Sequence, residues 1–299
     1  MRARRSAAGP RTSFPGAMPQ TAHREDTAPA RIGRYTVDAP VVSGTFARLF
    51  RARDPALDRQ VAIKLFSLAP EQAAAICFDV AEWRRRFVVE ARVMAALDHP
   101  HVVRVLDVGR HEGAPYMVMP YLAANLRREI GRDEGGPGLA PLERPRAMEP
   151  RRAATVLAEL ASALAAIHAA GLVHRDVKPT NLLLTRPQNG SVKLCDFGMA
   201  KVAGRAEPAE PVWFGSPDYM APEQGRGAHF ATDRSDVYAA GVLGWRLLLG
   251  RLPDGDISGL PPEAPDGLRR LLADATSVEP CRRPSAAEMV GRLAELDWG

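Results

Sequence analysis

The sequence predicts an α+β fold in which a small antiparallel sheet comes first and helices follow. Short apolar runs with β-branched and aromatic residues fill residues 34–42, 45–54 and 60–66, and they indicate three antiparallel strands. Residues 71–97 then carry apolar residues at three- and four-residue spacing, and residues 151–170 are rich in Ala and Leu, which is typical of helices. A chain of 299 residues, 46% hydrophobic and 25% charged, has room for one large domain or for two lobes with a cleft between them.

The net charge of +5 is concentrated near the N-terminus. Of 40 basic and 35 acidic residues, seven arginines and two acids precede residue 35, which leaves 33 of each sign in the rest of the chain. A nucleic-acid-binding domain needs a basic stripe on its folded surface, so we expect no nucleic-acid partner. Residues 1–33 are rich in Arg, Ala, Pro, Ser and Thr, which predicts a disordered basic tail.

The cysteines and the apolar runs favour a cytoplasmic protein. Cys77, Cys195 and Cys281 are odd in number, far apart and not spaced as metal ligands, which argues against a disulfide framework or a zinc site. No apolar run reaches the ~20 residues of a membrane-spanning helix. The longest candidate, residues 237–250, contains Arg246. We therefore expect no membrane partner.

Residues 174–198, HRDVKPTNLLLTRPQNGSVKLCDFG, concentrate the chemistry of the chain. They place Asp176, Lys178 and Asn181 within six positions, and Asp196 precedes Phe-Gly after a strand-turn-strand pattern. Such a hairpin would present the four side chains at one mouth, where oxygens suit Mg²⁺ and an ammonium suits phosphate. A lone aspartate in a turn more often only caps the turn. The combination of residue types favours a site instead.

This stretch resembles the catalytic and metal-binding loops of bacterial, eukaryotic-like serine/threonine protein kinases, H-R-D-L-x-x-x-N followed by D-F-G. VAIK at residues 61–64 resembles the third-strand motif of that family, and FGSPDYMAPE at residues 214–223 resembles the end of its activation segment. The likeness covers most of residues 34–295. It implies a bilobal fold, with an N-lobe of small antiparallel sheet and one main helix at residues 34–119 and a hinge and mostly α-helical C-lobe at residues 120–299.

The resemblance implies a role for each residue of the site. Asp176 would accept the proton of the substrate hydroxyl or orient it, and Lys178 would neutralise the transferring phosphoryl group. Lys64, oriented by Glu90, would contact the α- and β-phosphates of ATP. Asn181 and Asp196 would hold Mg²⁺ or Mn²⁺. The implied ATP-binding positions are Val42, Gly44, Leu49, Ala62, Lys64, Met119, Pro120, Leu122, Asn181, Leu183 and Asp196.

Further implied positions support the site. Met94, Val105, His174 and Phe197 would form an apolar stack between the lobes, although each is also an ordinary core residue. Residues 115–122 would form a strand that runs into the hinge. Asp236 would be a buried aspartate of the central C-lobe helix, and Glu223 would pair with Arg283. Residues 131–150 are rich in Gly and Pro and predict a surface loop with no assigned role.

The phosphate-binding loop departs from the family. Aligned without gaps, Val42, Gly44 and Ala47 stand where three glycines are usual. Glycine lets the backbone approach phosphate closely and adopt positive φ, so its replacement is expected to weaken nucleotide binding.

The activation segment departs as well. No Ser, Thr or Tyr lies between Gly198 and Gly215, so the usual activating phosphorylation cannot occur there. Glu207 and Glu210 lie in this segment instead. Either one of them pairs with Arg175 in place of a phosphate, or both are solvated.

Two functions stay open. The first is a serine/threonine protein kinase that transfers the ATP γ-phosphate to hydroxyls of protein substrates without activation-loop phosphorylation. The second is a pseudokinase that acts as a scaffold or a weak nucleotide-binding module. The complete set of charged residues favours the first, and Val42 and Ala47 favour the second. A small-molecule phosphotransferase is disfavoured because residues 214–223 resemble a peptide-positioning segment.

Overall fold

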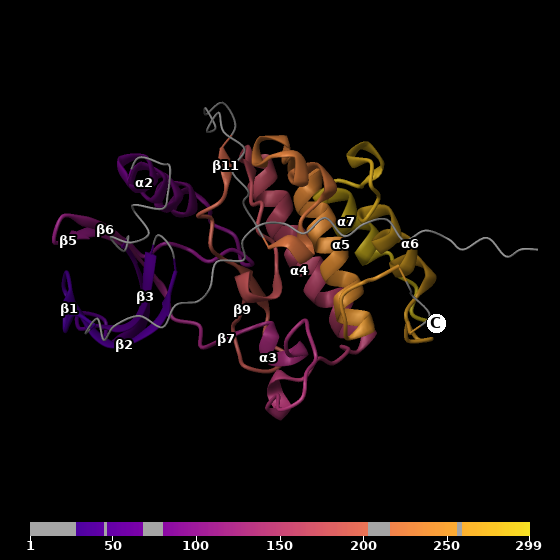
Figure 1. Ribbon diagram of the computed structural model, residues 1–299, viewed down its shortest axis with the longest axis horizontal. Helices are drawn as coiled ribbons and strands as arrows, with labels where there is room; N and C mark the ends of the chain where they lie inside the picture. The colour runs from indigo at the N-terminus through magenta and orange to yellow at the C-terminus, as the bar shows by residue number, and fades with distance from the viewer. Residues whose placement is uncertain (1–27, 45–46, 68–79, 203–215, 256–258) are drawn as a thin grey trace, which may run out of the picture.

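The computed structural model describes residues 28–44, 47–67, 80–202, 216–255 and 259–299. A strand-rich lobe and a helical lobe lie side by side (Figure 1). The predicted α+β, bilobal fold is therefore confirmed. Most of the predicted tail, residues 1–27, lies outside the described residues, and so do residues 71–79 of the predicted first helix.

One antiparallel sheet of six strands makes up most of the described N-lobe, in the order β1-β2-β3-β4-β6-β5. The three strands predicted from the sequence are present. The sheet begins ahead of the boundary expected at residue 34, because β1 pairs with β2 and buries Ile32 completely. The strands are β1 (Arg31–Ile32), β2 (Tyr35–Ser43), β3 (Ala47–Asp54), β4 (Arg59–Phe66), β5 (Asp107–His111) and β6 (Ala114–Pro120).

The two faces of β4 pack against different parts of the protein. Val61, Ile63 and Leu65 pack in a small core on one face of the sheet, as the alternation in the sequence predicts. Lys64 points to the other face, toward helix α2 (Val80–Ala96). That helix belongs to the large core that continues into the helical lobe.

Part of the C-lobe consists of short strands and short helical segments. The β9–β10 pair is antiparallel, so the strand-turn-strand pattern of the sequence is present. These elements are β7 (Ala124–Asn125), α3 (Arg127–Ile130), η1 (Pro141–Glu143), β8 (Leu172–Val173), η2 (Pro179–Asn181), β9 (Leu182–Leu184), β10 (Val192–Leu194) and β11 (Lys201–Val202).

The helical lobe is built on α4 (Pro150–Ala169) and α5 (Asp233–Leu249), which pack on each other and on the later helices. α5 and α6 approach closely because Gly241 has no side chain. A Cβ there would meet Ala275 Cβ at 2.9 Å. The remaining elements are η3 (Pro217–Tyr219), η4 (Pro222–Arg226), η5 (Ala228–Phe230), α6 (Asp266–Ala275), η6 (Pro280–Arg282) and α7 (Ala286–Ala294).

The expectation about apolar runs needs a correction. Helix α4, of 20 residues, is long and apolar enough to cross a membrane by length and composition alone, so residues 237–250 are not the longest candidate. Half of the tested window of α4 is buried inside the fold. Its apolar residues fill the core of the helical lobe, which accounts for its composition.

Candidate active site

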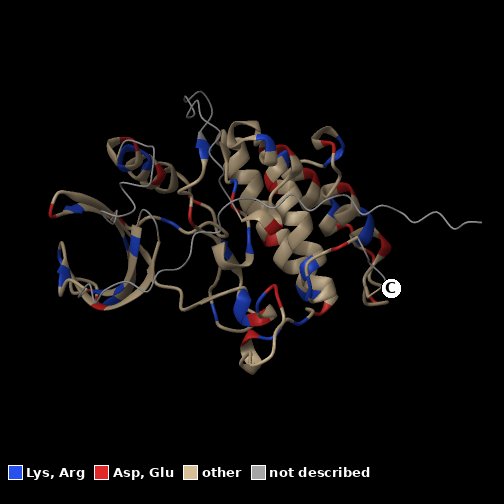
Figure 2. Ribbon diagram, in the orientation of Figure 1, with Lys and Arg blue, Asp and Glu red and all other residues tan. Residues whose placement is uncertain are grey.

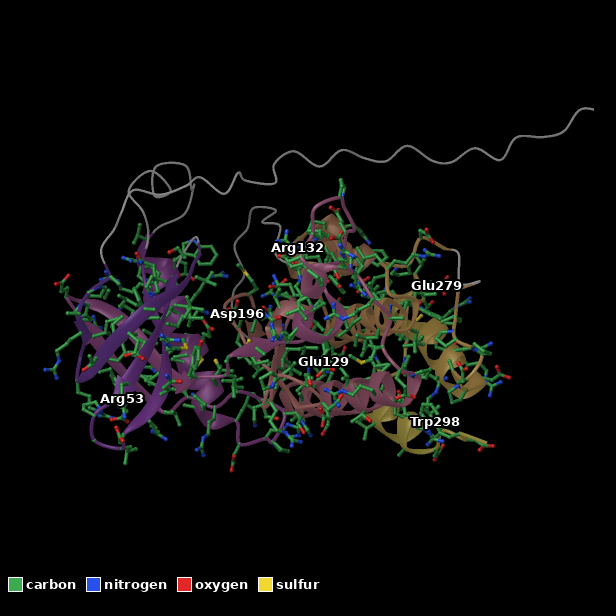
Figure 3. All side chains as sticks on the ribbon, turned by 90° about the horizontal axis from the view of Figure 1, so that it is seen from below. Arg53, Glu129, Arg132, Asp196, Glu279 and Trp298 are labelled. Carbon is green, nitrogen blue, oxygen red and sulfur yellow. The ribbon has the colours of Figure 1, made fainter. Side chains whose placement is uncertain are left out.

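Three charged side chains, Lys64, Glu90 and Asp196, form a cluster that we call the lysine triad. The Lys64 ammonium lies 2.7 Å from Glu90 Oε1 and 2.9 Å from Asp196 Oδ1. Lys64 comes from β4 and Glu90 from the buried side of α2, and Asp196 follows β10. Asp196 lies where the strand-rich and helical lobes meet (Figure 3). The triad therefore connects both main N-lobe elements to the C-lobe hairpin.

The electrostatics favour the charged forms of Lys64 and Asp196. Burial alone would lower the pKa of Lys64, but the Asp196 and Glu90 carboxylates outweigh it and hold that pKa above its ordinary value. The Lys64 ammonium in turn lowers the pKa of Asp196 to about 2. Burial raises the pKa of Glu90, and Lys64 opposes that rise. The Glu90 side chain is 4% exposed and that of Asp196 is 50% exposed, so Asp196 keeps access for a cation.

The backbone leading to the site is held by the helical lobe. The Asp236 carboxylate of α5 accepts hydrogen bonds from the N–H of His174 at 2.8 Å and of Arg175 at 2.7 Å. Arg175 and Asp196 both have left-handed backbone conformations, with φ of 69° and 64°. Such conformations cost about 1 kcal/mol or more in a non-glycine residue, and surrounding bonds must hold them. Asp236 supplies these bonds on the Arg175 side.

Asp176 and Lys178 form a second charged pair. Lys178 Nζ lies 2.7 Å from Asp176 Oδ2, and the Asn181 amide donates to the same oxygen at 3.0 Å. The Ser216 hydroxyl accepts from Lys178 Nζ at 2.9 Å and donates to Asp176 Oδ1 at 3.3 Å. Both carboxylate oxygens of Asp176 therefore have partners that fix its orientation. A hydroxyl already lies within hydrogen-bond reach of it.

The donor set fits a hard cation. The Asn181 amide nitrogen donates to Asp176, so the amide oxygen is the atom that it can offer to a metal. The main-chain N–H of Cys195 donates to the main-chain oxygen of Asn181 at 3.0 Å, which keeps Asn181 beside Asp196. Across the described ranges, no group of three or more His, Cys, Asp or Glu side chains could hold a metal. Two protein oxygens suit Mg²⁺, which usually keeps waters and binds substrate phosphates.

A family model for the protein kinase domain matches residues 35–291. The chain belongs to the protein kinase family. The match begins at the first residue of β2 and ends within α7, so it includes both lobes and every charged residue of the site.

This kinase chain is similar to bacterial serine/threonine-protein kinases, as the sequence motifs predict. PrkC of Bacillus subtilis (strain 168) is 31% identical over 277 residues, which cover 86% of this chain and 39% of that protein. Pkn2 of Myxococcus xanthus is 33% identical over 270 residues, covering 88% and 29%. PknL of Mycobacterium tuberculosis (strain ATCC 25618 / H37Rv) is 34% identical over 282 residues, covering 86% and 64%. The chain thus spans less than two thirds of the length of each of these relatives.

The residues predicted to surround adenine lie on β3, β4, β6, the connector after it and β9. Ala62 is directly opposite Met119 in the β4–β6 pairing, and both are buried. Contact of Ala62 and Met119 with a nucleotide stays a prediction. The same holds for four other predicted positions, Leu49, Pro120, Leu122 and Leu183.

Strands β2 and β3 flank the segment predicted to bind phosphate. β2 and β3 stay paired up to Ser43 and Arg48, and the Gly44 N–H donates to the Ala47 main-chain oxygen at 2.8 Å. Val42 lies opposite Leu49, and its side chain is exposed. Residues 45–46 lie outside the described residues. An exposed β-branched residue therefore occupies the position where the family has its first glycine.

The predicted supporting contacts are present. The rings of His174 and Phe197 meet edge to face at 4.9 Å between centroids, and both side chains are buried. Met94 is fully buried in the same core cluster, and Val105 packs against it. Two further predictions are confirmed, because Glu223 pairs with Arg283 at 2.7 Å and Asp236 is 1% exposed.

Sequence reasoning missed two contacts, one at the site and one elsewhere in the C-lobe. The first is the contact of the Ser216 hydroxyl with Asp176 and Lys178. The second is that of Asp133, in the segment predicted to be a surface loop without a role. Its side chain is 8% exposed and pairs with the fully buried Arg246 at 3.0 Å. Glu207 and Glu210 lie outside the described residues, so their pairing with Arg175 stays a prediction.

Proposed function

We propose that this chain is an ATP-dependent serine/threonine protein kinase. The observation that carries the proposal is the joint placement of the two charged pairs, Lys64–Glu90 and Asp176–Lys178, around Asp196 and Asn181. Phosphoryl transfer depends on positioning and charge neutralisation more than on covalent chemistry, and this arrangement has a residue for each task. The names of the similar bacterial proteins support the same activity.

The residues divide the reaction between them. ATP would supply the γ-phosphoryl group, and Mg²⁺ or Mn²⁺ would neutralise part of the charge on its phosphates. Lys64, held by Glu90, would contact the phosphates, and Asn181 and Asp196 would offer oxygens to the metal. Asp176 accepts the proton of the substrate hydroxyl as its oxygen bonds to phosphorus. The bond from phosphorus to the β–γ bridging oxygen breaks, and ADP leaves. Lys178 stabilises the charge on the group in transfer.

The proposed substrates are serine and threonine side chains of proteins. Lys178 follows Asp176 by two positions, which resembles the serine/threonine class. The Ser216 hydroxyl beside Asp176 supports the view that this carboxylate is adapted to an aliphatic hydroxyl. Basic and acidic residues are interspersed on the described ribbon of both lobes, which favours a protein partner over nucleic acid (Figure 2). We also propose a cytoplasmic location.

We further propose that the enzyme is active without phosphorylation of its activation segment. Residues 199–214 contain no hydroxyl side chain, and Glu207 and Glu210 stand in that segment. One of these carboxylates would supply a permanent negative charge for Arg175, in place of a phosphate of about −2. The test replaces both by Gln. Activity should fall, whereas the same charge change at the exposed Glu263 and Glu295 should leave it intact. Full activity after both changes in the segment would refute this part.

The second candidate function is a pseudokinase scaffold, which the exposed Val42 in the phosphate loop favours. A thermal-shift titration separates the two. A nucleotide at 100 times its Kd stabilises the protein by about 2.7 kcal/mol. A shift with ATP and metal, together with transfer of labelled phosphate to a generic protein substrate, supports the enzyme. A shift without transfer supports a nucleotide-binding pseudokinase, and no shift and no transfer leave only the scaffold.

A further inference from the structure

Helix α5 buries the charged side chain of Arg246 completely. Its guanidinium donates to Asp133 Oδ1 at 3.0 Å and to the main-chain oxygens of Ile130 at 3.1 Å and Arg132 at 2.6 Å. A buried cation is tolerated only when such partners replace its hydration. Arg246 therefore fixes the end of α3 and the residues after it to the central helix of the C-lobe.

Asp133 links this anchor to the segment after Ser216. The Tyr219 hydroxyl donates to Asp133 Oδ1 at 2.9 Å, the same oxygen that Arg246 binds. The other oxygen, Oδ2, accepts from Arg127 at 3.1 Å. Tyr219 is 4% exposed, so its ring is held in place. Burial and the nearby Asp133 carboxylate raise the pKa of Tyr219, so its hydroxyl stays protonated and donates.

Tyr219 is one short turn away from the reacting groups. Its main-chain N–H donates to the Ser216 main-chain oxygen at 3.0 Å, which closes η3. Ser216 in turn contacts both Asp176 and Lys178 through its hydroxyl. A continuous path of short contacts therefore runs from Arg246 through Asp133 and Tyr219 to this charged pair.

We propose that Asp133 is a positioning residue for the protein substrate. Held by Arg246, it fixes the turn that carries Ser216 by accepting the hydrogen bond from the Tyr219 hydroxyl. The proposal rests on the kinase function proposed above, in which this turn lies where the peptide binds. A loosened turn weakens peptide binding, whereas the lysine triad lies on other elements and keeps its hold on ATP.

The test is Tyr219→Phe, which removes only the hydroxyl. The KM for a Ser/Thr peptide should rise about three- to tenfold, the effect of one lost hydrogen bond. The KM for ATP and the kcat at saturating peptide should stay within about twofold of the wild type. Tyr238→Phe is the matched control. Tyr238 lies on α5 beneath the Arg283 guanidinium, so its variant should leave the peptide KM unchanged.

A double-mutant comparison assigns the effect to Asp133. Asp133→Ala, which removes both acceptor oxygens, should also raise the peptide KM, and adding Tyr219→Phe should raise it no further, because both changes break the same contact. Where Asp133→Ala fails to fold, Tyr219→Phe alone decides. If the wild type is active and Tyr219→Phe leaves the peptide KM unchanged, this proposal is overturned and the proposed function stands. Equal rises in both KM values together with a lower Tm indicate a merely structural role and also overturn it. A wild type that transfers no phosphate overturns both proposals.

Discussion

The Lys64 ammonium lies 2.7 Å from the Glu90 carboxylate, and this pair joins strand β4 to helix α2. The lysine is 17% exposed at its side chain and the glutamate 4%. An ion pair this deep is costly to break from one side, because the remaining charge has no water to solvate it. The pair therefore belongs to the candidate site and also helps to hold β4 against α2.

Lys64→Met should destabilise the protein and abolish phosphate transfer. It leaves the Glu90 carboxylate buried, with Asp196 as a second negative charge nearby. Removing one partner of a buried pair costs about 3–5 kcal/mol, which corresponds to a fall in Tm of roughly 10 °C. Adding Glu90→Gln should recover part of the Tm but none of the activity. Thermal unfolding of the three proteins measures this, and an unchanged Tm in Lys64→Met would contradict the buried-pair account.

Gly198→Ala should weaken metal use without weakening the fold. A Cβ at this position would lie 3.3 Å from Asp196 Oδ1 and 3.5 Å from Lys64 Nζ, so the half-exposed Asp196 carboxylate has to shift. The Mg²⁺ concentration for half-maximal activity should rise several-fold, with Tm nearly unchanged.

Gly291→Ala is the matched control for that substitution. Gly291 is an exposed residue of α7 with open space around it, so alanine should stabilise the helix by about 0.5–1 kcal/mol and leave the metal requirement alone. Equal metal requirements in both alanine variants would show that Asp196 tolerates the added methyl group.

Ionisation of Asp196 should make the free energy of unfolding rise with pH. Its pKa falls from an ordinary 3.8 to about 2 because of Lys64, so its ionised form stabilises the folded state above pH 4. That contribution is lost as the pH falls from about 4 toward 2. The difference in unfolding free energy between wild type and Asp196→Asn should be constant between about pH 5 and 7 and should change only below that range. Urea denaturation at several pH values measures it.

Ionisation of Asp218 should change the free energy of unfolding in the opposite direction in the same experiment. Asp218 is exposed, but partial desolvation and the nearby Asp133 raise its pKa, so its ionised form disfavours the folded state once the pH exceeds the unfolded-state value. Asp218→Asn should therefore gain stability relative to the wild type as the pH rises. The same pH trend for both variants would contradict the assigned electrostatics.

The site residues that could be predicted from the sequence are those that belong to a short motif with fixed residue types and spacing. Lys64, Asp176 and Asn181 each follow from short patterns, and the structure confirms the one side-chain partner predicted among them, Glu90 beside Lys64. The Arg246–Asp133 contact joins residues 113 positions apart, and the Gly/Pro-rich segment around Asp133 has no periodicity that would reveal it. Arg246 was noted in the sequence only as a charge that argues against a membrane-spanning run, and its partner was not predicted.

Strand β5 was missed for a similar reason. Its sequence, DVGRH, shows no alternation of apolar and polar residues, and its side chains are half-buried or exposed. The strand exists because β6 pairs with it along its whole length. Pairing with a neighbour, and not local preference, decides such edge strands.

Val42→Gly should improve nucleotide binding. Val42 is 60% exposed at the end of β2, where a side chain would keep the backbone from approaching a bound phosphate. The Kd for ATP with Mg²⁺ should fall several-fold. Val41→Gly, at the neighbouring position that is 43% exposed, should not lower it. Equal or weaker binding in Val42→Gly would mean that another contact closes the loop over the nucleotide.

Phosphate transfer by the wild type and by Asp176→Asn tests the central claim most directly. The measurement is kcat with ATP, Mg²⁺ or Mn²⁺ and a Ser/Thr-containing protein substrate, with Asp297→Asn as an exposed acid control. We predict that Asp176→Asn lowers kcat by about 100-fold or more, the usual contribution of a positioned acid or base. Its thermal shift with ATP should be retained. A wild type that transfers no more phosphate than Asp176→Asn would contradict the assignment of this chain as an active kinase.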